Sequence, residues 1–299
     1  MEINKIIIAG AGTMGLQIAL QCASHDYQVS VIDNNPQVWD QARDSLNGYA
    51  QAAARDGYLE PDQIQSVLEN VQLAADPARA AATADLLIES IPEDPALKMQ
   101  FFSEFNRLCP PRTVFTTNTS SLVPSMFAEA SGRGHLLAAL HFHQPVWSAN
   151  ICDVMPHAGT DSEVTNTLLE FARSIGQVPI FLQKESYGYV FNAMYNALNR
   201  AAITLAANGI ASVEDIDRAW MVVMKMPVGP FGMLDSVGVD TAWYITRYWA
   251  DALGDQQLAI NADFLKSYLD RGRLGAKSQA GFYDYPDPPY ARPGFLTGE

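Results

Sequence analysis

The sequence predicts an α/β fold in which a doubly wound, mostly parallel sheet precedes an all-helical C-terminal domain. Short β-branched runs alternate with helical patterns as far as about residue 185, and a glycine-rich turn follows the first run. Beyond that point long amphipathic patterns predominate. Alternation of this kind is typical of parallel strands joined by helices. Because 299 residues also suit two cores better than one, we expect domains at residues 1–185 and 186–299.

The first domain is predicted to begin with a strand, a helix and a second strand. KIIIAG (5–10) and QVSVID (28–33) are apolar, β-branched runs, and TMGLQIALQCASH (13–25) between them has apolar residues at helical spacing. The alternation continues to the end of the domain. We expect further strands at 85–90, 113–118, 136–142 and 178–182, and helices at 95–108 and 162–176.

The second domain is predicted from four segments that Gly and Pro residues separate. Each segment is long and amphipathic, as the helices of a globular domain are. The sequence therefore predicts an all-helical C-terminal domain. We expect its helices at 188–209, 212–226, 233–253 and 261–272.

Composition and charge exclude several classes of protein. The formal net charge of -14, from 33 acidic and 19 basic residues, argues against nucleic acid or an anionic membrane as a partner. No segment approaches the roughly 20 apolar residues that span a bilayer. Cys22, Cys109 and Cys152 are odd in number and lack CxxC spacing, so we expect neither a disulfide framework nor a structural zinc site. We expect a cytoplasmic protein.

The turn after the first strand, GAGTMG, has the G-x-G-x-x-G spacing. Because it follows a predicted strand and begins a predicted helix, it indicates a dinucleotide-binding turn of the Rossmann type. Its glycines permit a tight turn, a close approach of a pyrophosphate to the helix N-terminus, and close helix packing. The alternative is a glycine turn without a ligand. The predicted cofactor-binding residues are Gly10, Gly12, Thr13, Met14 and Gly15.

Asp33 ends the second predicted strand, eighteen residues after Gly15. A carboxylate at this place accepts hydrogen bonds from the ribose 2'-hydroxyl of NAD and repels the 2'-phosphate of NADP. The following Asn-Asn-Pro supplies no arginine for such a phosphate. NAD is therefore the predicted cofactor. If the glycine pattern is accidental, Asp33 is a solvated carboxylate at a strand end.

The sequence resembles the L-3-hydroxyacyl-CoA dehydrogenase family, including its relatives that act on small hydroxy acids without CoA. The resemblance covers nearly the whole chain and depends on the order and spacing of GAGTMG with Asp33, SIPEDPALK, TNTSSL, LHFHQPV, GYVFNA, VGPFGMLDSVGVD and GAKSQAGFYDY. It implies a Rossmann-type N-terminal domain, a helical C-terminal domain through which two subunits form a homodimer, and a role in fatty acid metabolism. It also implies NAD-dependent oxidation of a short-chain L-3-hydroxyacyl-CoA, such as 3-hydroxybutyryl-CoA, and the reverse reduction.

His141 ends an apolar run, and Asp153 lies in a second such run twelve residues later. Oxidation of a secondary alcohol needs a base that titrates near working pH, and a carboxylate at the far nitrogen of a histidine fixes its tautomer. Chain reversal between neighbouring strands could bring the two together, and the resemblance implies such a dyad. The family usually has Glu here, so the shorter Asp153 is expected to need a backbone shift or a bridging water. The alternatives are a packed core histidine and an aspartate paired with an arginine.

The resemblance implies two further residues at the substrate. Ser120 of TNTSSL is expected near the reacting oxygen, although a hydroxyl here could also be a helix N-cap. Asn192 of GYVFNA is expected to position the substrate carbonyl. Around it, Tyr187 and Ala193 replace the Pro and Arg that are usual in the family.

The resemblance also implies cofactor contacts outside the glycine turn. Asn118 is expected at the ribose, and Gln144, where the family usually has asparagine, at the nicotinamide. Glu93 and Lys98 match cofactor-side residues of the family. Without that role they would be an ordinary charge pair on a helix face.

The charge pattern leaves the substrate open. Residues 36–75, where the family's CoA-contacting helices are expected, contain only Arg43 and Arg55 against six carboxylates. A multiply anionic nucleotide calls for more basic residues than that. A free 3-hydroxy acid or a dicarbonyl ester is therefore an alternative to a CoA thioester.

Two other classes of protein are alternatives. His141 and His143, with Asp153 and His157, could bind a metal in a hydrolase, but this leaves the glycine turn without a purpose, and we predict no metal. A non-catalytic, crystallin-like protein that binds NAD is the other class. The retained Ser120, His141 and Asn192 argue against it.

Overall fold

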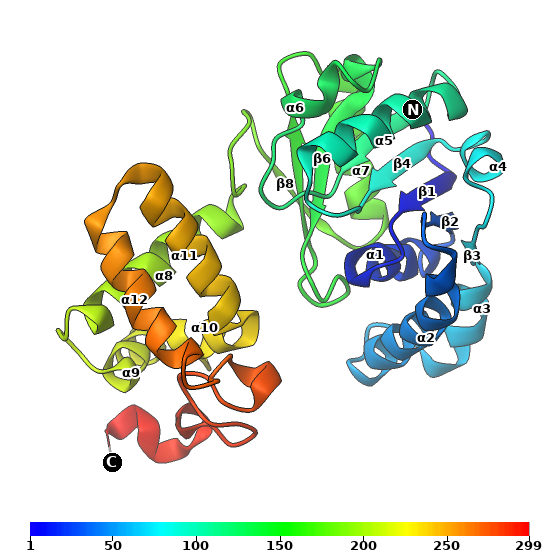
Figure 1. Ribbon diagram of the computed structural model, residues 1–299. Coiled ribbons are helices and arrows are strands. Elements are labelled where there is room, and N and C mark those ends of the chain that lie inside the picture. The colour runs from blue at the N-terminus through cyan, green and yellow to red at the C-terminus, as the bar shows by residue number, and fades with distance from the viewer. Residues whose placement is uncertain (299) are drawn as a thin grey trace. The chain divides into compact units, whose positions relative to one another are not determined.

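The computed structural model in Figure 1 describes residues 1–298 and has two compact units, the first from Met1 to Val190 and the second from Phe191 onward. Strands alternate with helices in the first unit, and the second unit is helical. The predicted fold class is thus confirmed. The domain boundary predicted between residues 185 and 186 lies in the connection between the last strand and the next helix. Among the described residues, no helix has both the length and the apolar character needed to cross a membrane.

The first unit is built on one eight-stranded sheet. Its strands are β1 (Lys5–Ala9), β2 (Gln28–Ile32), β3 (Val71–Leu73), β4 (Leu86–Glu89), β5 (Val114–Thr117), β6 (Leu137–Phe142), β7 (Ile151–Pro156) and β8 (Val178–Phe181). They lie in the order β3-β2-β1-β4-β5-β6-β7-β8, and only β6 and β7 pair antiparallel. The strand order reverses between β1 and β4, and α/β proteins bind ligands at the carboxyl ends of the strands at such a point.

Helices cover both faces of this sheet. Alternate residues of β1 face opposite sides: Ile6 and Ile8 pack with Leu16 of the first helix, whereas Ile7 packs with Phe102 on the other face. This is the burial pattern of a doubly wound sheet, because successive side chains of a strand point to opposite faces. The helices of this unit are α1 (Thr13–Ala23), α2 (Trp39–Arg55), α3 (Ile64–Glu69), α4 (Pro77–Ala81), α5 (Pro95–Leu108), α6 (Ser125–Ala128) and α7 (Ser162–Ser174).

Several elements differ from those predicted. Strand β3 was not predicted, because it has only three residues and shows no period of its own. The single helix predicted at 233–253 was wrong: Gly238, with φ 109°, divides it into two helices. The last long helix begins before residue 261, since Asp255 caps it by accepting from the N–H of Gln257 and Leu258. The helices of the second unit are α8 (Phe191–Ala207), α9 (Val213–Met224), α10 (Pro230–Val237), α11 (Val239–Leu253) and α12 (Gln256–Leu269).

Two buried carboxylates hold the second unit together. Asp217 accepts hydrogen bonds from the N–H of Phe231 at 2.8 Å and of Gly232 at 3.0 Å, and from the Tyr283 hydroxyl at 2.9 Å. Asp235 accepts from two backbone N–H groups and a tyrosine hydroxyl in the same way. These contacts tie the segment VGPFGMLD to the segment GFYDY, and every donor is satisfied, as buried polar groups require.

Candidate active site

The glycine turn lies between β1 and α1, and the space around each of its three glycines differs. A Cβ on Gly10, which has φ 107°, would lie 2.5 Å from the Ser90 carbonyl oxygen, and one on Gly15 would lie 1.9 Å from the Gly10 oxygen. A Cβ on Gly12 would meet nothing within 4 Å. Open space therefore adjoins the start of α1, which has no side-chain cap and no acidic residue in its first turn. This arrangement fits a dinucleotide pyrophosphate, which backbone N–H groups at a helix N-terminus can bind.

Asp33 is fixed beside this turn at the end of β2. Its Oδ2 accepts from the Ala11 N–H at 2.9 Å and its Oδ1 accepts from the Asn35 N–H at 2.9 Å. Each carboxylate oxygen can accept a second hydrogen bond, so both remain able to accept from a ribose hydroxyl. Of the other two predicted residues of the turn, Thr13 is exposed and Met14 is half-buried against the core.

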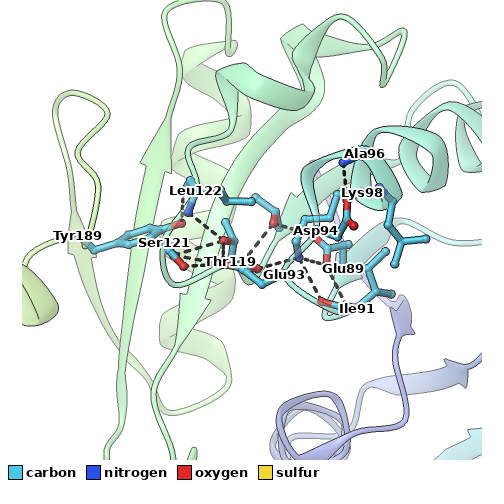
Figure 2. A network of polar contacts seen from close by, with 12 residues as sticks. Glu89, Ile91, Glu93, Asp94, Ala96, Lys98, Thr119, Ser121, Leu122 and Tyr189 are labelled. Carbon is cyan, nitrogen blue, oxygen red and sulfur yellow. Dashed lines mark hydrogen bonds and ion pairs between the residues drawn. The ribbon is translucent and has the colours of Figure 1, made fainter. Parts of the chain in front are cut away.

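Lys98 and Glu93 belong to a polar network at the carboxyl ends of β4 and β5 (Figure 2). The Lys98 ammonium contacts Glu89 Oε1 at 2.5 Å, Glu93 Oε2 at 3.2 Å and the Ile91 carbonyl at 3.2 Å. Its side chain is only 1% exposed and that of Glu89 is fully buried. Lys98 is therefore not part of an ordinary surface pair on a helix face; Glu93 precedes α5 (Pro95–Leu108), and its side chain is 38% exposed. All three donors of Lys98 are used within the protein.

The same network joins the loop after β4 to the loop after β5. Glu93 accepts hydrogen bonds from the hydroxyls of Thr119 and Ser121, the latter at 2.9 Å. Burial alone would raise the pKa of Glu93, but Thr119, Lys98 and Ser121 together lower it. Burial raises the pKa of Glu89, and the contact with Lys98 only partly offsets this. The network thus fixes two loops that border the sheet's switch point.

Ser120 lies in the second of these loops with its side chain exposed. The alternative role of this segment, capping a local turn, is filled by Thr119, whose hydroxyl accepts from the Leu122 N–H at 3.0 Å. Within the described residues, the Ser120 hydroxyl makes no hydrogen bond of its own. It is therefore available to a ligand.

Asn118 connects the ends of β5 and β6. Its N–H donates to the Glu89 carbonyl at 2.8 Å, and its Oδ1 accepts from the Phe142 N–H at 2.8 Å. Its amide NH₂ makes no hydrogen bond with the part of the chain that the structure describes, so it is left for another partner. Gln144, two residues beyond β6, is exposed. The predicted cofactor-side residues of the first unit thus follow the carboxyl ends of β1, β2, β4, β5 and β6.

His141 and Asp153 are directly opposite each other in the antiparallel pair β6 and β7. His141 Nδ1 lies 3.0 Å from Asp153 Oδ2, and the two residues are 4% and 0% exposed. The expected bridging water is not needed, because residues opposite each other in such a pair already have adjacent side chains. The alternative of an arginine partner for Asp153 was wrong.

Two neighbours complete this centre. His143 Nε2 also lies 3.0 Å from Asp153 Oδ2, so two imidazoles share one carboxylate oxygen. The buried Tyr189 ring stacks on the His141 ring, with the ring centroids 4.6 Å apart. The Tyr189 hydroxyl donates to the Leu122 carbonyl at 3.4 Å, and Figure 2 shows these two residues side by side. The imidazole of His141 is thereby held in one orientation from two sides.

The electrostatics of this centre favour a neutral histidine next to an ionised aspartate. Burial lowers the pKa of His141; the hydrogen bond to Asp153 opposes this, and the nearby His143 adds to it. Burial would raise the pKa of Asp153, but the two histidine hydrogen bonds outweigh it and lower the pKa. Because a carboxylate only accepts, Nδ1 of His141 carries the hydrogen and Nε2 is left to accept a proton. The arrangement can act as a general base.

His157, the fourth ligand considered for a metal hydrolase, lies outside this centre. Its Nε2 contacts the Gly134 carbonyl at 2.9 Å, and its Nδ1 accepts from the Gly159 N–H at 3.1 Å. Both ring nitrogens therefore serve a local turn. His157 therefore does not join His141, His143 and Asp153, and the alternative of a four-residue metal site was wrong for this residue.

The chain matches the description "3-hydroxyacyl-CoA dehydrogenase, NAD binding domain" over residues 5–186 and "3-hydroxyacyl-CoA dehydrogenase, C-terminal domain" over residues 188–285. The chain belongs to the 3-hydroxyacyl-CoA dehydrogenase family. It is an oxidoreductase of this family, and the matched domain indicates NAD as the cofactor.

Individual members of the family resemble the chain over nearly its whole length. It is 30% identical to a probable 3-hydroxybutyryl-CoA dehydrogenase of Bacillus subtilis, over 96% of this chain and 99% of that protein. It is 27% identical to the human mitochondrial hydroxyacyl-coenzyme A dehydrogenase, over 95% of this chain and 91% of that protein. A solved diketoreductase, studied for its catalysis on dicarbonyl compounds, has a TM-score of 0.89 and 36% identity, over 95% of this chain and 100% of that one.

Not all site residues of this family member were predicted. Glu89, His143 as a partner of Asp153, and Tyr189 were missed. A charged residue that ends an apolar strand was the available signal for Glu89, and the His-Phe-His spacing was the signal for His143. Tyr189 had none, because only the folded chain shows its ring on His141. Asn192 is the second residue of α8, in the second unit, and its role at the substrate stays a prediction.

Proposed function

We propose that this protein catalyses NAD-dependent oxidation of an L-3-hydroxyacyl substrate to the 3-oxo compound, and the reverse reduction. His141 is the general acid-base and Asp153 its positioning partner. The observation that carries this proposal is the direct contact of 3.0 Å between His141 Nδ1 and Asp153 Oδ2, on strands of the sheet that carries the glycine turn. An unprotonated Nε2 is what removal of a hydroxyl proton requires.

In the oxidation, Nε2 of His141 takes the proton of the substrate hydroxyl, and Asp153 stabilises the imidazolium that forms. Bound NAD supplies the acceptor for the hydride that leaves the same carbon. In the reduction, the imidazolium returns its proton to the developing alkoxide. Ser120, whose hydroxyl is exposed, and Asn192 are the residues that we propose to hold the reacting oxygen.

The cofactor would be held by the residues that follow the strand ends. Gly12 would leave room for the pyrophosphate, and Asp33, which already accepts from the Ala11 N–H, would also accept from the ribose. Asn118 has an unused amide, whereas Lys98 has no donor to spare. We therefore propose that Lys98 and Glu93 act indirectly, by fixing the two loops against which the cofactor lies.

A short-chain acyl-CoA, such as 3-hydroxybutyryl-CoA, is the first candidate substrate. It is supported by membership of the family and by the relative from Bacillus subtilis named as a probable 3-hydroxybutyryl-CoA dehydrogenase, which matches the chain almost from end to end.

A small 3-oxo acid or dicarbonyl ester without CoA is the second candidate, and a specific observation favours it. Of the two arginines between residues 36 and 75, Arg43 is already paired with Asp40 at 3.0 Å. This leaves little positive charge on the α2 and α3 region for a nucleotide phosphate. The solved diketoreductase, at 36% identity, points the same way.

The deciding experiment measures NADH oxidation with acetoacetyl-CoA, acetoacetate and a dicarbonyl ester, each at several concentrations. A kcat/KM that is highest for acetoacetyl-CoA supports the first candidate, and one that is highest for either small compound supports the second. NADPH is the matched control, and we expect it to be the poorer reductant because Asp33 repels its 2'-phosphate. Lack of turnover with all three compounds would contradict the proposed function.

We also propose that the protein is a cytoplasmic homodimer that pairs through the helical unit. On α11, the side chains of Tyr244, Tyr248 and Trp249 are 67%, 65% and 48% exposed, which is unusual for three aromatic residues on one helix. Aromatic residues are enriched at protein interfaces. The three free, buried cysteines agree with a reducing compartment. Sedimentation of the wild type beside Tyr248→Glu tests the pairing, and we expect only the variant to be monomeric.

A further inference from the structure

We propose that His141, His143 and Asp153 also form a binding site for a transition-metal cation of the zinc type, and that metal bound there inhibits the enzyme. This site is distinct from the hydrolase site considered from the sequence, because it lacks His157 and supplies no catalysis. The ligand atoms come from the end of β6, the residue just beyond it, and the facing position of β7.

The distances from Asp153 to the two histidines fit a zinc ion. One ligand atom from each of the three residues lies within 4.8 Å of the others, and Asp153 Oδ2 is 3.0 Å from a nitrogen of each histidine. Around tetrahedral zinc, with bonds of about 2.0–2.1 Å, ligand atoms lie roughly 3.3 Å apart. Both distances to Asp153 are therefore within a few tenths of an ångström of those around a bound zinc ion. Three protein ligands leave a fourth position open for water.

The carboxylate provides a second, independent observation. Asp153 Oδ1 is buried and has no hydrogen-bond partner within the described part of the chain, although the residue is 0% exposed. An unsatisfied carboxylate oxygen in such a place is rare in folded proteins. A cation bound between the two imidazoles would neutralise the charge of this carboxylate. Two N–H donors on a single oxygen leave the other oxygen without a partner among the described residues.

The donor set determines which metals fit. Two imidazole nitrogens and one carboxylate oxygen suit zinc, copper or nickel, whereas magnesium and calcium prefer oxygen ligands alone. Cys152 is next to Asp153 in the sequence, but its side chain is part of the hydrophobic core between the sheet and α1 and α7. It is therefore no ligand. The His143 side chain is 12% exposed, which gives the ion a route from solvent.

Inhibition follows from the tautomer that metal binding imposes. A neutral His141 that binds metal through Nδ1 must carry its hydrogen on Nε2, so the proton moves from one ring nitrogen to the other and none is released. Nε2 then cannot accept the hydroxyl proton of a substrate. In the reduction the metal-bound ring is no imidazolium and is a poor proton donor. This part of the inference rests on the proposed function; the binding itself does not.

The binding experiment uses the full chain, freed of metal with EDTA and dialysed. Zn²⁺ is titrated in competition with a chromophoric chelator, and Co²⁺ serves as a spectroscopic probe. We expect one Zn²⁺ per chain, at least 10-fold weaker binding by His143→Phe, and cobalt bands in the visible region without a thiolate charge-transfer band. His143→Gln is a second variant in case the phenylalanine impairs folding, which circular dichroism reports.

His135→Gln is the matched control, since His135 is an exposed histidine outside the site. It should bind Zn²⁺ as the wild type does. Equal affinity in the wild type and both His143 variants would overturn the site, because the metal would then lie elsewhere. A thiolate band from Co²⁺ would overturn it too.

The activity experiment adds Zn²⁺ to the enzyme while NADH is followed in either direction. We expect turnover of the wild type and of His135→Gln to fall at least 10-fold when the site is filled and to return with EDTA, and turnover of His143→Phe to respond only at higher zinc concentrations. One bound Zn²⁺ with undiminished turnover would overturn the inhibition. An enzyme inactive toward every substrate would contradict the proposed function, while the competition titration would still decide the metal site.

Discussion

Asp153 in the first unit and Asp235 in the second are both buried carboxylates, but they are held in different ways. Asp235 accepts from the N–H of Phe282 and Tyr283 and from the Tyr285 hydroxyl, so both of its oxygens are satisfied. Asp153 receives two imidazole nitrogens on one oxygen and, among residues 1–298, no hydrogen bond on the other. Backbone donors cannot change their charge, whereas imidazoles can. The contacts of Asp235 therefore stabilise the fold. The contacts of Asp153 place its charge next to imidazoles that can gain or lose a proton.

The pKa values of the two carboxyl groups move in opposite directions. Burial raises the pKa of Asp235, and its three hydrogen-bond donors and the charge of Arg273 only partly offset this. For Asp153 burial acts in the same sense, but the hydrogen bonds from His141 and His143 outweigh it and lower the pKa. The difference lies in the partners rather than in the depth of burial. A buried carboxylate held mainly by titratable side chains is thus a better guide to an active site than burial alone.

The largest effect is expected from His141→Ala. Loss of a general acid-base typically lowers the rate by about 10²- to 10⁴-fold, so kcat should fall in this range. The affinity for NADH should change little, because the cofactor is proposed to lie against the glycine turn and Asp33. Stopped-flow turnover and NADH fluorescence titration measure the two quantities. Wild-type turnover in the variant would exclude His141 from the chemistry.

Asp153→Asn tests the carboxylate at the centre of the comparison. The amide oxygen can still accept from His141, but the negative charge that stabilises the imidazolium is gone. We expect kcat to fall by about 10- to 100-fold, the range typical when the carboxylate partner of a metal-bound histidine is changed. Rescue in Asp153→Glu, which restores the charge, would separate this loss from a general disturbance. A Glu variant no better than Asn would contradict the positioning role.

Asp235→Asn is the counterpart in the second unit. In this variant the amide NH₂ takes the place of one carboxylate oxygen and cannot accept a hydrogen bond. At least one of the buried donors that Asp235 pairs with is then left without an acceptor. We expect the free energy of unfolding to decrease by about 1–3 kcal/mol. At a temperature where the variant is folded, kcat should stay near the wild-type value. Urea unfolding and turnover give the two numbers, and a loss of turnover without a loss of stability would break the comparison.

The same contrast explains which features could be predicted from sequence. The glycine turn with Asp33 was recognisable because its spacing is local, and the contact of His141 with Asp153 was anticipated because chain reversal joins neighbouring strands. The second imidazole on Asp153, the burial of Lys98 against Glu89 and the Tyr189 ring were not predicted, because these contacts depend on side-chain directions that only the folded chain shows. The local pattern was also the reason for the wrong prediction of one helix at 233–253, because its apolar spacing continues across Gly238, where the helix is interrupted.

His143→Phe sharpens the comparison by removing one of the two imidazoles. His143 contributes to the lowered pKa of His141, and it shares the oxygen that His141 uses. Without it the pKa of His141 should rise. Oxidation needs the neutral ring, so the acidic limb of its kcat profile should move to higher pH. The profiles are measured with EDTA present, to keep metal out of the result. An unmoved limb would show that His143 has no electrostatic influence on the base.

The smallest effect concerns stability against pH. Burial raises the pKa of Asp217 to about 6, against 3.8 for an ordinary aspartate. A carboxyl group with a raised pKa in the folded state stabilises fully below its unfolded pKa, and this stabilisation is lost as pH rises through the folded value. Between pH 7 and pH 5 the second unit should therefore gain on the order of 1 kcal/mol.

The first unit should respond with the opposite sign. The pKa of His141 is lowered on folding, so its contribution to stability is present above the unfolded value and is lost as pH falls through the folded one. Hydrogen exchange of amides in α10 and in β6, corrected for intrinsic rates, compares the units in one sample. Protection of α10 should increase on mild acidification while that of β6 decreases. Parallel changes in both would mean that the pH response of the protein does not come from these two buried groups.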